Sequence, residues 1–203
     1  MSVLRLLAGL LLILAVTTAA SAQSDYPSRT VRIVVGFGPG AAADLTARVL
    51  AQRLSKTMGQ QFIVENKPGG GSTVAAEQVV RAPKDGYTLF VGTVANVINA
   101  VLQPNLSFDF AKDFAPITYT TSSPNILVVH PATGVGSVKE LIALAKAKPE
   151  QVFFGSSGVG TSPHLSGELF NMMAGTKMVH VPYVGSAQAV TDLLAGRRWK
   201  DSR

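Results

Sequence analysis

Residues 31–40 read VRIVVGFGPG, a run of β-branched residues that leads into a glycine loop. A continuous β-branched run is typical of a strand buried on both faces of a parallel sheet. Leu50, Leu54 and Met58 then recur at helical spacing, and Gly59 follows as a helix stop. This stretch predicts a strand over 31–35, a loop over 36–40 and a helix over 41–58.

The same order of strand, loop and helix continues to residue 92. The predicted strands are 62–65 and 87–92, with the loop NKPGGGS over 66–72 and a helix over 73–82. Crossovers of this length imply a parallel sheet with helices on its faces.

Residues 103–125 lose this order and contain Pro104, Pro116 and Pro124. The pattern returns beyond them, where Ser137 and Glu140 form a capping-box sequence, and Ser162 before Pro163 is the predicted N-cap of a later helix. The predicted strands of this second part are 126–130, 152–155 and 178–181, and a helix over 186–195 ends it.

The fold class predicted is therefore α/β, with two lobes that each hold a mostly parallel sheet flanked by helices. The predicted division is a signal peptide over 1–22, a first lobe over 23–103, a hinge or crossover over 104–125, a second lobe over 126–196 and a basic tail over 197–203.

The first 22 residues have the features of a secretory signal, with Arg5, an apolar run over 6–16 and a small-residue site at 20–22. Cleavage is expected after Ala22, and the expected location is the periplasm. A membrane anchor is the alternative, because residues 6–22 are uncharged and nearly long enough to span a bilayer.

Composition excludes several kinds of chemistry. The chain has 203 residues and no cysteine, which rules out disulfides, zinc–thiolate sites, iron–sulfur clusters and a cysteine nucleophile. The formal charge of +6 comes mostly from Arg5 and the tail RRWKDSR, and the remaining acidic and basic side chains nearly balance. No nucleic-acid partner is therefore expected.

Glycine or serine loops follow the predicted strands at 36–40, 69–72 and 156–162, and each precedes a helix. Unpaired N–H groups and the positive end of the helix dipole favour an anion there. None of these loops contains lysine or arginine. A carboxylate is therefore a better candidate ligand than a polyphosphate, although tight turns alone also explain such loops.

Other kinds of site remain as alternatives. Residues 36–41 fit a dinucleotide fingerprint, although Pro39 removes a donor and Asp44 adds negative charge. Residues 155–159 approach the G-x-S-x-G elbow, so a periplasmic serine hydrolase of small esters using Ser157 is the runner-up function. His130, His164 and His180 lack the spacing of metal ligands.

Residues 26–196 resemble the periplasmic solute-binding receptors of tripartite tricarboxylate transporters, the Bug-type receptors. The resemblance is carried by YPSRTVRIVVGFGPGAAADLTARVLAQRL, VENKPGGGSTVAAEQVVRAPKDGYTL, DFAPI, SVKELIALAKAKP, SSGVGTSPHLSGELF and HVPYVGSAQAVTDLLAG. It implies a two-lobed fold of the type II periplasmic-binding-protein kind. It also implies a monomer that captures a di- or tricarboxylate, or a related acid, for a membrane permease, without catalysis, cofactor or metal.

The resemblance also implies which residues bind the ligand. In the first lobe they are Phe37, Gly38, Pro39, Gly40 and Ala41, with Asp44 organising the loop, then Gly69, Gly70, Gly71 and Ser72, and finally Thr93 and Asn96. In the second lobe they are Ser156, Ser157, Gly158, Gly160, Thr161 and His164, followed by Pro182, Tyr183 and Gly185.

The sequence departs from this family in two respects. Proline usually stands where Gly36 and Gly38 are, glycine where Ala41 is, and often lysine where Val184 is, so the ligand preference could differ. After Gly196 the family continues for roughly another hundred residues, whereas this sequence has RRWKDSR. We interpret that tail as a frameshift, and we expect an incomplete second lobe and an incomplete return to the first.

Overall fold

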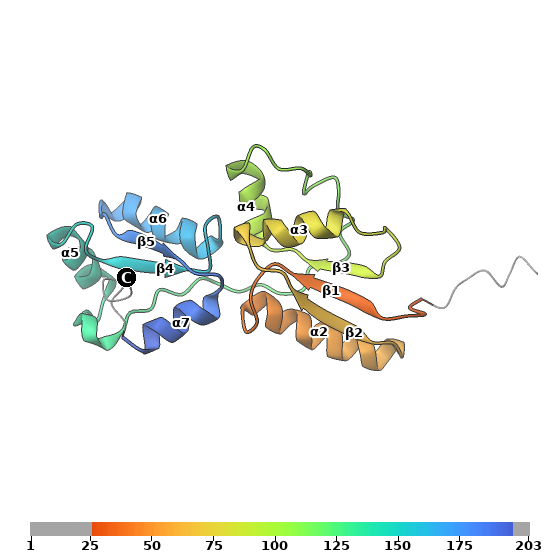
Figure 1. Cartoon of the computed structure of the whole chain (residues 1–203). Coiled ribbons are helices and arrows are strands. Elements are labelled where there is room, and N and C mark those ends of the chain that lie inside the picture. Colours follow the sequence, from red (N-terminus) through yellow and green to blue (C-terminus); the bar gives the residue numbers. More distant parts are fainter. Residues whose placement is uncertain (1–25, 197–203) are drawn as a thin grey trace, which may run out of the picture.

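The computed structural model describes residues 26–196, which form two parallel β-sheets flanked by helices (Figure 1). The predicted signal peptide and basic tail lie outside the described residues. The first sheet has the order β2-β1-β3, and all its strands are parallel, as predicted. Its strands are β1 (Val31–Val35), β2 (Phe62–Asn66) and β3 (Thr88–Val91).

Three helices accompany this sheet, and together they form the unit that we call the first lobe. They are α2 (Ala42–Met58), α3 (Thr73–Val80) and α4 (Val94–Leu102), with a 3-10 turn, η2 (Gly70–Ser72), before α3. Helix α2 ends at Gly59, whose φ of 69° is left-handed, as the sequence predicts. Its buried face includes Ala47 and Ala51, whereas Met58 is 38% exposed. Small side chains at that face allow the helix to lie close to the sheet.

The second sheet pairs β4 (Phe153–Ser156) with β5 (Val179–Pro182) in parallel. The accompanying helices are α5 (Val138–Ala147), α6 (Ser162–Ala174) and α7 (Ser186–Leu194), and we call this unit the second lobe. Ser137 caps α5 by accepting a hydrogen bond from the Glu140 N–H, as predicted. For α6 the prediction is wrong by one residue, because Thr161 is the N-cap and Ser162 is already helical.

The predicted strand over 126–130 is also absent. These residues have no strand assignment, and Ile126 is 77% exposed. A strand needs a neighbour that completes its ladder of hydrogen bonds, and within the described residues the second sheet contains only β4 and β5. His130 instead precedes a 3-10 turn, η3 (Pro131–Thr133), where its Nδ1 accepts a hydrogen bond from the Ala132 N–H at 3.1 Å.

Residues 103–125 link the lobes without helix or strand, and an aromatic cluster attaches them to the first lobe. Phe114 packs on Phe90 of β3 with ring centroids 5.4 Å apart, and Phe110 lies 5.1 Å from Phe114. The chain then runs across to the second lobe (Figure 1).

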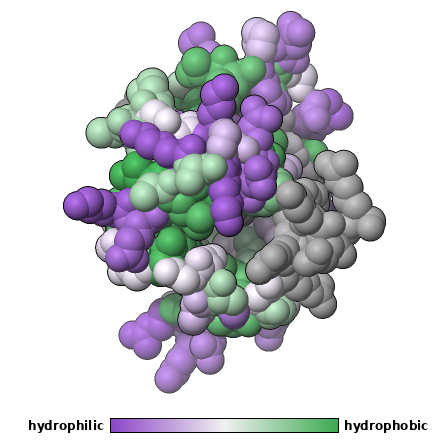
Figure 2. All heavy atoms as spheres, turned by 90° about the vertical axis from the view of Figure 1, so that its left-hand side faces the viewer, coloured by the Kyte–Doolittle hydropathy of each residue, from purple (hydrophilic) through white to green (hydrophobic). Residues whose placement is uncertain are grey.

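The main hydrophobic core lies in the first lobe, around Val31, Val35 and Phe62. In the second lobe, α6 and α7 contain no fully buried residue, and Met172 and Met173 are more than 70% exposed. Figure 2 views this lobe end-on and shows hydrophobic surface in several places between hydrophilic side chains. Among residues 26–196, no helix combines the length and apolar character that a membrane span requires.

Candidate functional site

The starts of α2 and α7 face each other across the boundary between the lobes (Figure 1). A Cβ atom added to Gly40 would lie 3.5 Å from the Ala187 Cβ, and one added to Gly185 would lie 3.7 Å from the Gly38 backbone nitrogen. The loop before α3 meets the loop before α6 in the same way, because a Cβ on Gly71 would lie 2.7 Å from the Val159 carbonyl oxygen. The glycine loops thus come together from both lobes.

None of the helices that start at this boundary has a side-chain cap. Helices α2, α3, α6 and α7 all lack a capping hydrogen bond from their N-cap residue. At α4 the Asn96 side chain accepts a hydrogen bond from the Thr93 N–H, and at α5 the Ser137 side chain caps the helix. Uncapped helix starts leave backbone N–H donors available, and their dipoles favour negative charge. The boundary between the lobes is therefore suited to an anion.

The first glycine loop is held by Asp44, which is 1% exposed. Its Oδ2 accepts hydrogen bonds from the Gly40 N–H and from Arg48 Nε, both at 2.9 Å, and its Oδ1 accepts one from Asn66 Nδ2 at 2.8 Å. Asn66 Nδ2 also donates to the Phe37 carbonyl at 2.9 Å. Burial alone would raise the pKa of Asp44, but the hydrogen bonds from Arg48, Gly40 and Asn66 hold that pKa below its usual value.

A cavity of about 120 Å³ lies between the starts of α2 and α7. Among residues 26–196, no charged side chain lines it, and Gln188 supplies the one polar side chain of its walls. The lining residues are Gly38, Pro39, Ala41, Val184, Gly185, Ala187 and Gln188. The predicted site residues Gly38, Pro39, Ala41 and Gly185 are therefore brought together here.

At the other side of the boundary, Asn99 of α4 fills the space between the lobes. Asn99 is 1% exposed, and its Nδ2 donates to the Gly71 carbonyl at 3.2 Å. A Cβ added to Gly160 of the second lobe would collide with the Asn99 amide. The boundary is thus closed at α3 and α6, and the cavity remains at α2 and α7.

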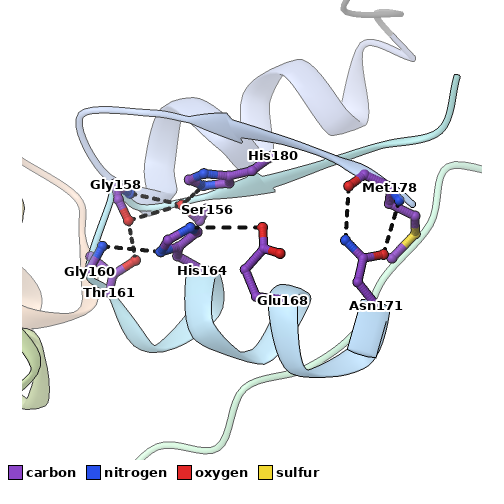
Figure 3. Close-up of polar contacts among 9 residues, drawn as sticks. All are labelled: Ser156, Gly158, Gly160, Thr161, His164, Glu168, Asn171, Met178 and His180. Atoms are coloured by element: carbon purple, nitrogen blue, oxygen red, sulfur yellow. Dashed lines mark hydrogen bonds and ion pairs between the residues drawn. The ribbon is translucent and has the colours of Figure 1, made fainter. Parts of the chain in front are cut away.

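The loop before α6 is organised by a serine and two histidines (Figure 3). Ser156 Oγ lies 2.6 Å from His180 Nε2 and accepts a hydrogen bond from the Gly158 N–H at 3.1 Å. The Thr161 hydroxyl donates to the Gly158 carbonyl at 2.6 Å. These bonds fix the backbone that leads into α6.

His164 of α6 packs on the His180 ring, which in turn contacts Ser156. Its ring stacks on His180 with centroids 4.0 Å apart, and its Nδ1 accepts a hydrogen bond from the Gly160 N–H at 3.2 Å. The Gly160 amide is therefore engaged within the loop. The opposite nitrogen, Nε2, faces Glu168 at 3.9 Å.

This arrangement predicts that stability falls on mild acidification. Burial, together with His164, lowers the pKa of His180, and Glu168 only partly opposes this effect. A depressed pKa in the folded protein means that the unfolded chain binds the proton first, so stability is lost as the pH falls below about 6.5. We expect the melting temperature to decrease between pH 7.5 and 5.5, and to decrease less in His180→Gln.

The control for this prediction is His130→Gln, which removes a histidine outside the stacked pair. An equal pH dependence in wild type and His180→Gln would contradict the assignment.

Other predicted site residues hold the scaffold and do not line the cavity. Asn96 accepts from the Thr93 N–H and donates from Nδ2 to the Ser72 carbonyl. The Tyr183 hydroxyl donates to Asp192 of α7 at 3.1 Å, and Pro182 is exposed at the end of β5. Gly69, Gly70 and Ser72 shape the turn before α3, where the Ser72 hydroxyl is buried against Gly36 without a hydrogen-bond partner among the described residues.

The geometry gives the serine hydrolase alternative no support. That alternative requires Ser157 beside a histidine, whereas the serine that pairs with a histidine is Ser156, which is 2% exposed. A nucleophile must reach its substrate, so this pair has a structural role. Within residues 26–196, no group of three or more His, Cys, Asp and Glu side chains lies where it could hold a metal ion.

Several residues of this region are not among the predicted site residues. Asn99 lies on α4, a helix that the sequence pattern does not predict. Arg48 and Gln188 each lie within the first two turns of a helix that follows a glycine loop. This position after a glycine loop is visible in the sequence, and it could have been used to predict both residues.

The sequence profile of the tripartite tricarboxylate transporter family receptors matches residues 46–199. A UPF0065 protein from Bordetella bronchiseptica is 39% identical over 193 residues, which are 95% of this chain and 56% of that protein. Protein BugT from Bordetella pertussis is 34% identical and matches 97% of this chain and 61% of its own length. The chain thus spans little more than half the length of these relatives.

Solved structures give the same result. The R. palustris protein Rpa4515, described with adipate, superposes with a TM-score of 0.78 at 39% identity over 83% of this chain and 56% of its own. MatC from Rhodopseudomonas palustris, described with bound malate, has a TM-score of 0.78 at 30% identity over 84% of this chain and 58% of its own. The two-lobed α/β architecture is therefore that of periplasmic binding proteins.

Proposed function

The chain belongs to the tripartite tricarboxylate transporter receptor family, and we propose that it captures a small organic acid between its two lobes. The observation that supports this proposal is the meeting of uncapped helix starts around an uncharged cavity. Relatives with the same architecture are described with adipate and malate, which are both carboxylates. No cofactor or metal takes part in such capture.

The binding mechanism follows from the backbone. The carboxylate would accept hydrogen bonds from N–H groups at the starts of α2 and α7, and the helix dipoles would balance its charge. Asp44 cannot itself neutralise an anion, so its role is to hold the Gly40 amide and the loop around it. Candidate contacts therefore remain Gly38 and Gly185. The Ala41 N–H donates to the Gly38 carbonyl at 3.3 Å, so Ala41 and the other predicted residues act as support.

The expected setting is the periplasm, and the expected partner is the membrane permease of a tripartite tricarboxylate transporter. Both follow from the family. We also propose that the first lobe ends at residue 103, that the second begins at residue 126, and that residues 104–125 act as a hinge. Capture of a ligand between two lobes requires that the lobes move relative to each other.

Ligand-induced stabilisation tests this function directly. Purified protein should melt at a higher temperature in the presence of an acid that it binds. At a ligand concentration of one hundred times Kd, the free energy of unfolding should rise by about 2.7 kcal/mol and the melting temperature by roughly 5–11 °C. Titration calorimetry would then give Kd. We expect no product by chromatography after prolonged incubation.

The matched control is the methyl ester of each acid, which lacks the negative charge and should produce no shift. Hydrolysis of such esters that is lost in Ser157→Ala would overturn the proposal in favour of an enzyme.

A further inference from the structure

The loop over residues 156–161 is the part of the second lobe that contacts α4 and η2 of the first lobe. Gly160 packs so closely on Asn99 that an added Cβ would collide with the Asn99 amide, and a Cβ on Gly71 would lie 2.7 Å from the Val159 carbonyl oxygen. Asn99 is buried and bonded to the Gly71 carbonyl, so the first-lobe side of this contact is fixed. The position of the loop therefore decides whether the lobes meet here.

The backbone at Gly160 is held by His164, the third residue of α6 after its N-cap Thr161. A side chain at this position can reach back to the backbone before the helix. The His164 Nδ1 accepts a hydrogen bond from the Gly160 N–H at 3.2 Å, which requires that Nδ1 carries no proton. The proton of the neutral ring then lies on Nε2, which faces Glu168 at 3.9 Å. A second proton can enter the ring only at Nδ1, where it would break the bond to Gly160.

His180 of β5 is the other titratable group beside His164. The two ring centroids are 4.0 Å apart, and His180 Nε2 lies 2.6 Å from Ser156 Oγ at the start of the same loop. Two positive rings at this separation repel each other, so the pair takes up one proton well before a second. Burial lowers the pKa of His180, which leaves the first proton to His164.

The other groups around the pair do not replace this titration. From α6, Glu168 is the acidic side chain that acts on His180, and from β4 the uncharged Phe154 stacks on the same ring at 5.0 Å. Helix α7 packs against Gly155, whose side of the strand is opposite to that of Phe154, so Asp192 of α7 lies on the other face of the sheet. The two first-lobe residues named above, an asparagine and a glycine, do not titrate.

We propose that His164 is a pH-sensitive switch between the lobes. The neutral ring holds Gly160 against Asn99 and lets the lobes meet, whereas the charged ring releases the loop. Histidine ordinarily changes its charge near pH 6.5, so the switch operates on mild acidification. Acid capture should weaken in the same range, and this last step rests on the proposed function, whereas release of the loop does not.

The matched variant is His164→Gln, because a glutamine keeps an acceptor for the Gly160 N–H and does not titrate. The chain has no cysteine, so Val101→Cys on α4 and Met173→Cys on α6, both at positions more than 70% exposed, can carry a pair of spin labels. Without any ligand, the distance between the labels should be longer and more broadly distributed at pH 5.5 than at pH 7.5. In His164→Gln it should stay the same at both pH values.

Nuclear magnetic resonance and circular dichroism complete the ligand-free test. The amide proton of Gly160 should shift with pH between 7.5 and 5.5 in the wild type and stay constant in His164→Gln, because only the histidine loses its acceptor. Circular dichroism at both pH values shows that each protein is folded, so that a longer distance reports movement of the lobes. His130→Gln, which removes a histidine outside the stacked pair, should behave like the wild type.

Titration calorimetry with malate and with adipate tests the effect on capture. Wild type and His164→Gln should bind each acid equally at pH 7.5. At pH 5.5 the wild type should bind roughly three- to tenfold more weakly than the variant, which is the effect of one neutral hydrogen bond. Comparison at the same pH removes the ionisation of the acid itself from the result.

The outcomes separate the switch from the function that it would regulate. A label distance that does not change with pH, or that changes equally in His164→Gln, would overturn the switch. Equal affinities of wild type and variant at pH 5.5 would overturn its effect on capture. If neither acid bound at pH 7.5, the proposed function would fail for these acids, and the label distances would still decide whether the switch exists.

Discussion

Asp44→Ala is expected to lower the free energy of unfolding by about 2–4 kcal/mol and the melting temperature by roughly 5–15 °C. The carboxylate is 1% exposed and accepts hydrogen bonds from the Gly40 N–H, Arg48 and Asn66. Its loss would leave buried donors without an acceptor. The same variant should weaken acid binding at least tenfold, because Gly40 and its loop would no longer be held at the cavity.

Two matched variants separate the stabilising effect of the Asp44–Arg48 ion pair from that of the hydrogen bond between Asp44 and the Gly40 N–H. Arg48 is half exposed, so Arg48→Ala should cost about 1 kcal/mol or less, and Glu77→Ala, which breaks the exposed pair with Arg81, should cost about 0.5 kcal/mol. Urea denaturation would measure all three. If Arg48→Ala proved as damaging as Asp44→Ala, the ion pair would be the main stabilising contact and the Gly40 amide bond a minor one.

The stabilising effect of Asp44 should also depend on pH in a defined direction. Because its pKa is lowered in the folded protein, the contribution is present above about pH 4 and is lost as the pH falls through the folded-state pKa. This range lies below the one in which His180 titrates, so acid unfolding should show two separate ranges of decline.

Gly160→Ala is expected to reduce acid affinity at least tenfold by holding the lobes apart. Gly160 has a φ of +75°, which disfavours any side chain, and its Cβ would meet the Asn99 amide from the other lobe. Because Asn99 is buried and bonded to the Gly71 carbonyl, it has little room to move. Closure over the cavity should therefore fail, which small-angle scattering would show as a larger radius of gyration.

Gly134→Ala is the control for this prediction, since Gly134 has a φ of +70° and open space around it. Gly134→Ala should lower the free energy of unfolding by about 1–2 kcal/mol, because alanine disfavours a left-handed backbone, but it should leave acid affinity unchanged. Adding Asn99→Ala to Gly160→Ala should restore part of the affinity, because the colliding group is removed. The lobes do not close on the contact between Gly160 and Asn99 if both glycine variants reduce acid affinity equally. The same conclusion follows if Asn99→Ala restores no affinity to Gly160→Ala.

Much of the fold could be predicted from the sequence because its signals are local. The β-branched run over 31–35 and Gly59 after a helical pattern specify a strand and a helix end within a few residues. The loops follow directly, and parallel sheets place them at the same edge. Hence the glycine loops of the candidate site, and the α/β class, were predictable without coordinates.

Side-chain partners could not be predicted in this way, because they depend on packing between segments far apart in the chain. Nothing around residue 126 reveals whether another strand will complete its hydrogen bonds, and none of the described strands does. Likewise Ser156 meets His180, and Asn99 meets Gly160, only because two sheets and their helices bring them within a few ångströms of each other. The sequence therefore determined which backbone groups could bind an anion. The packing of the two lobes determined which side chains surround them, because contacts across a boundary depend on distances that no local pattern encodes.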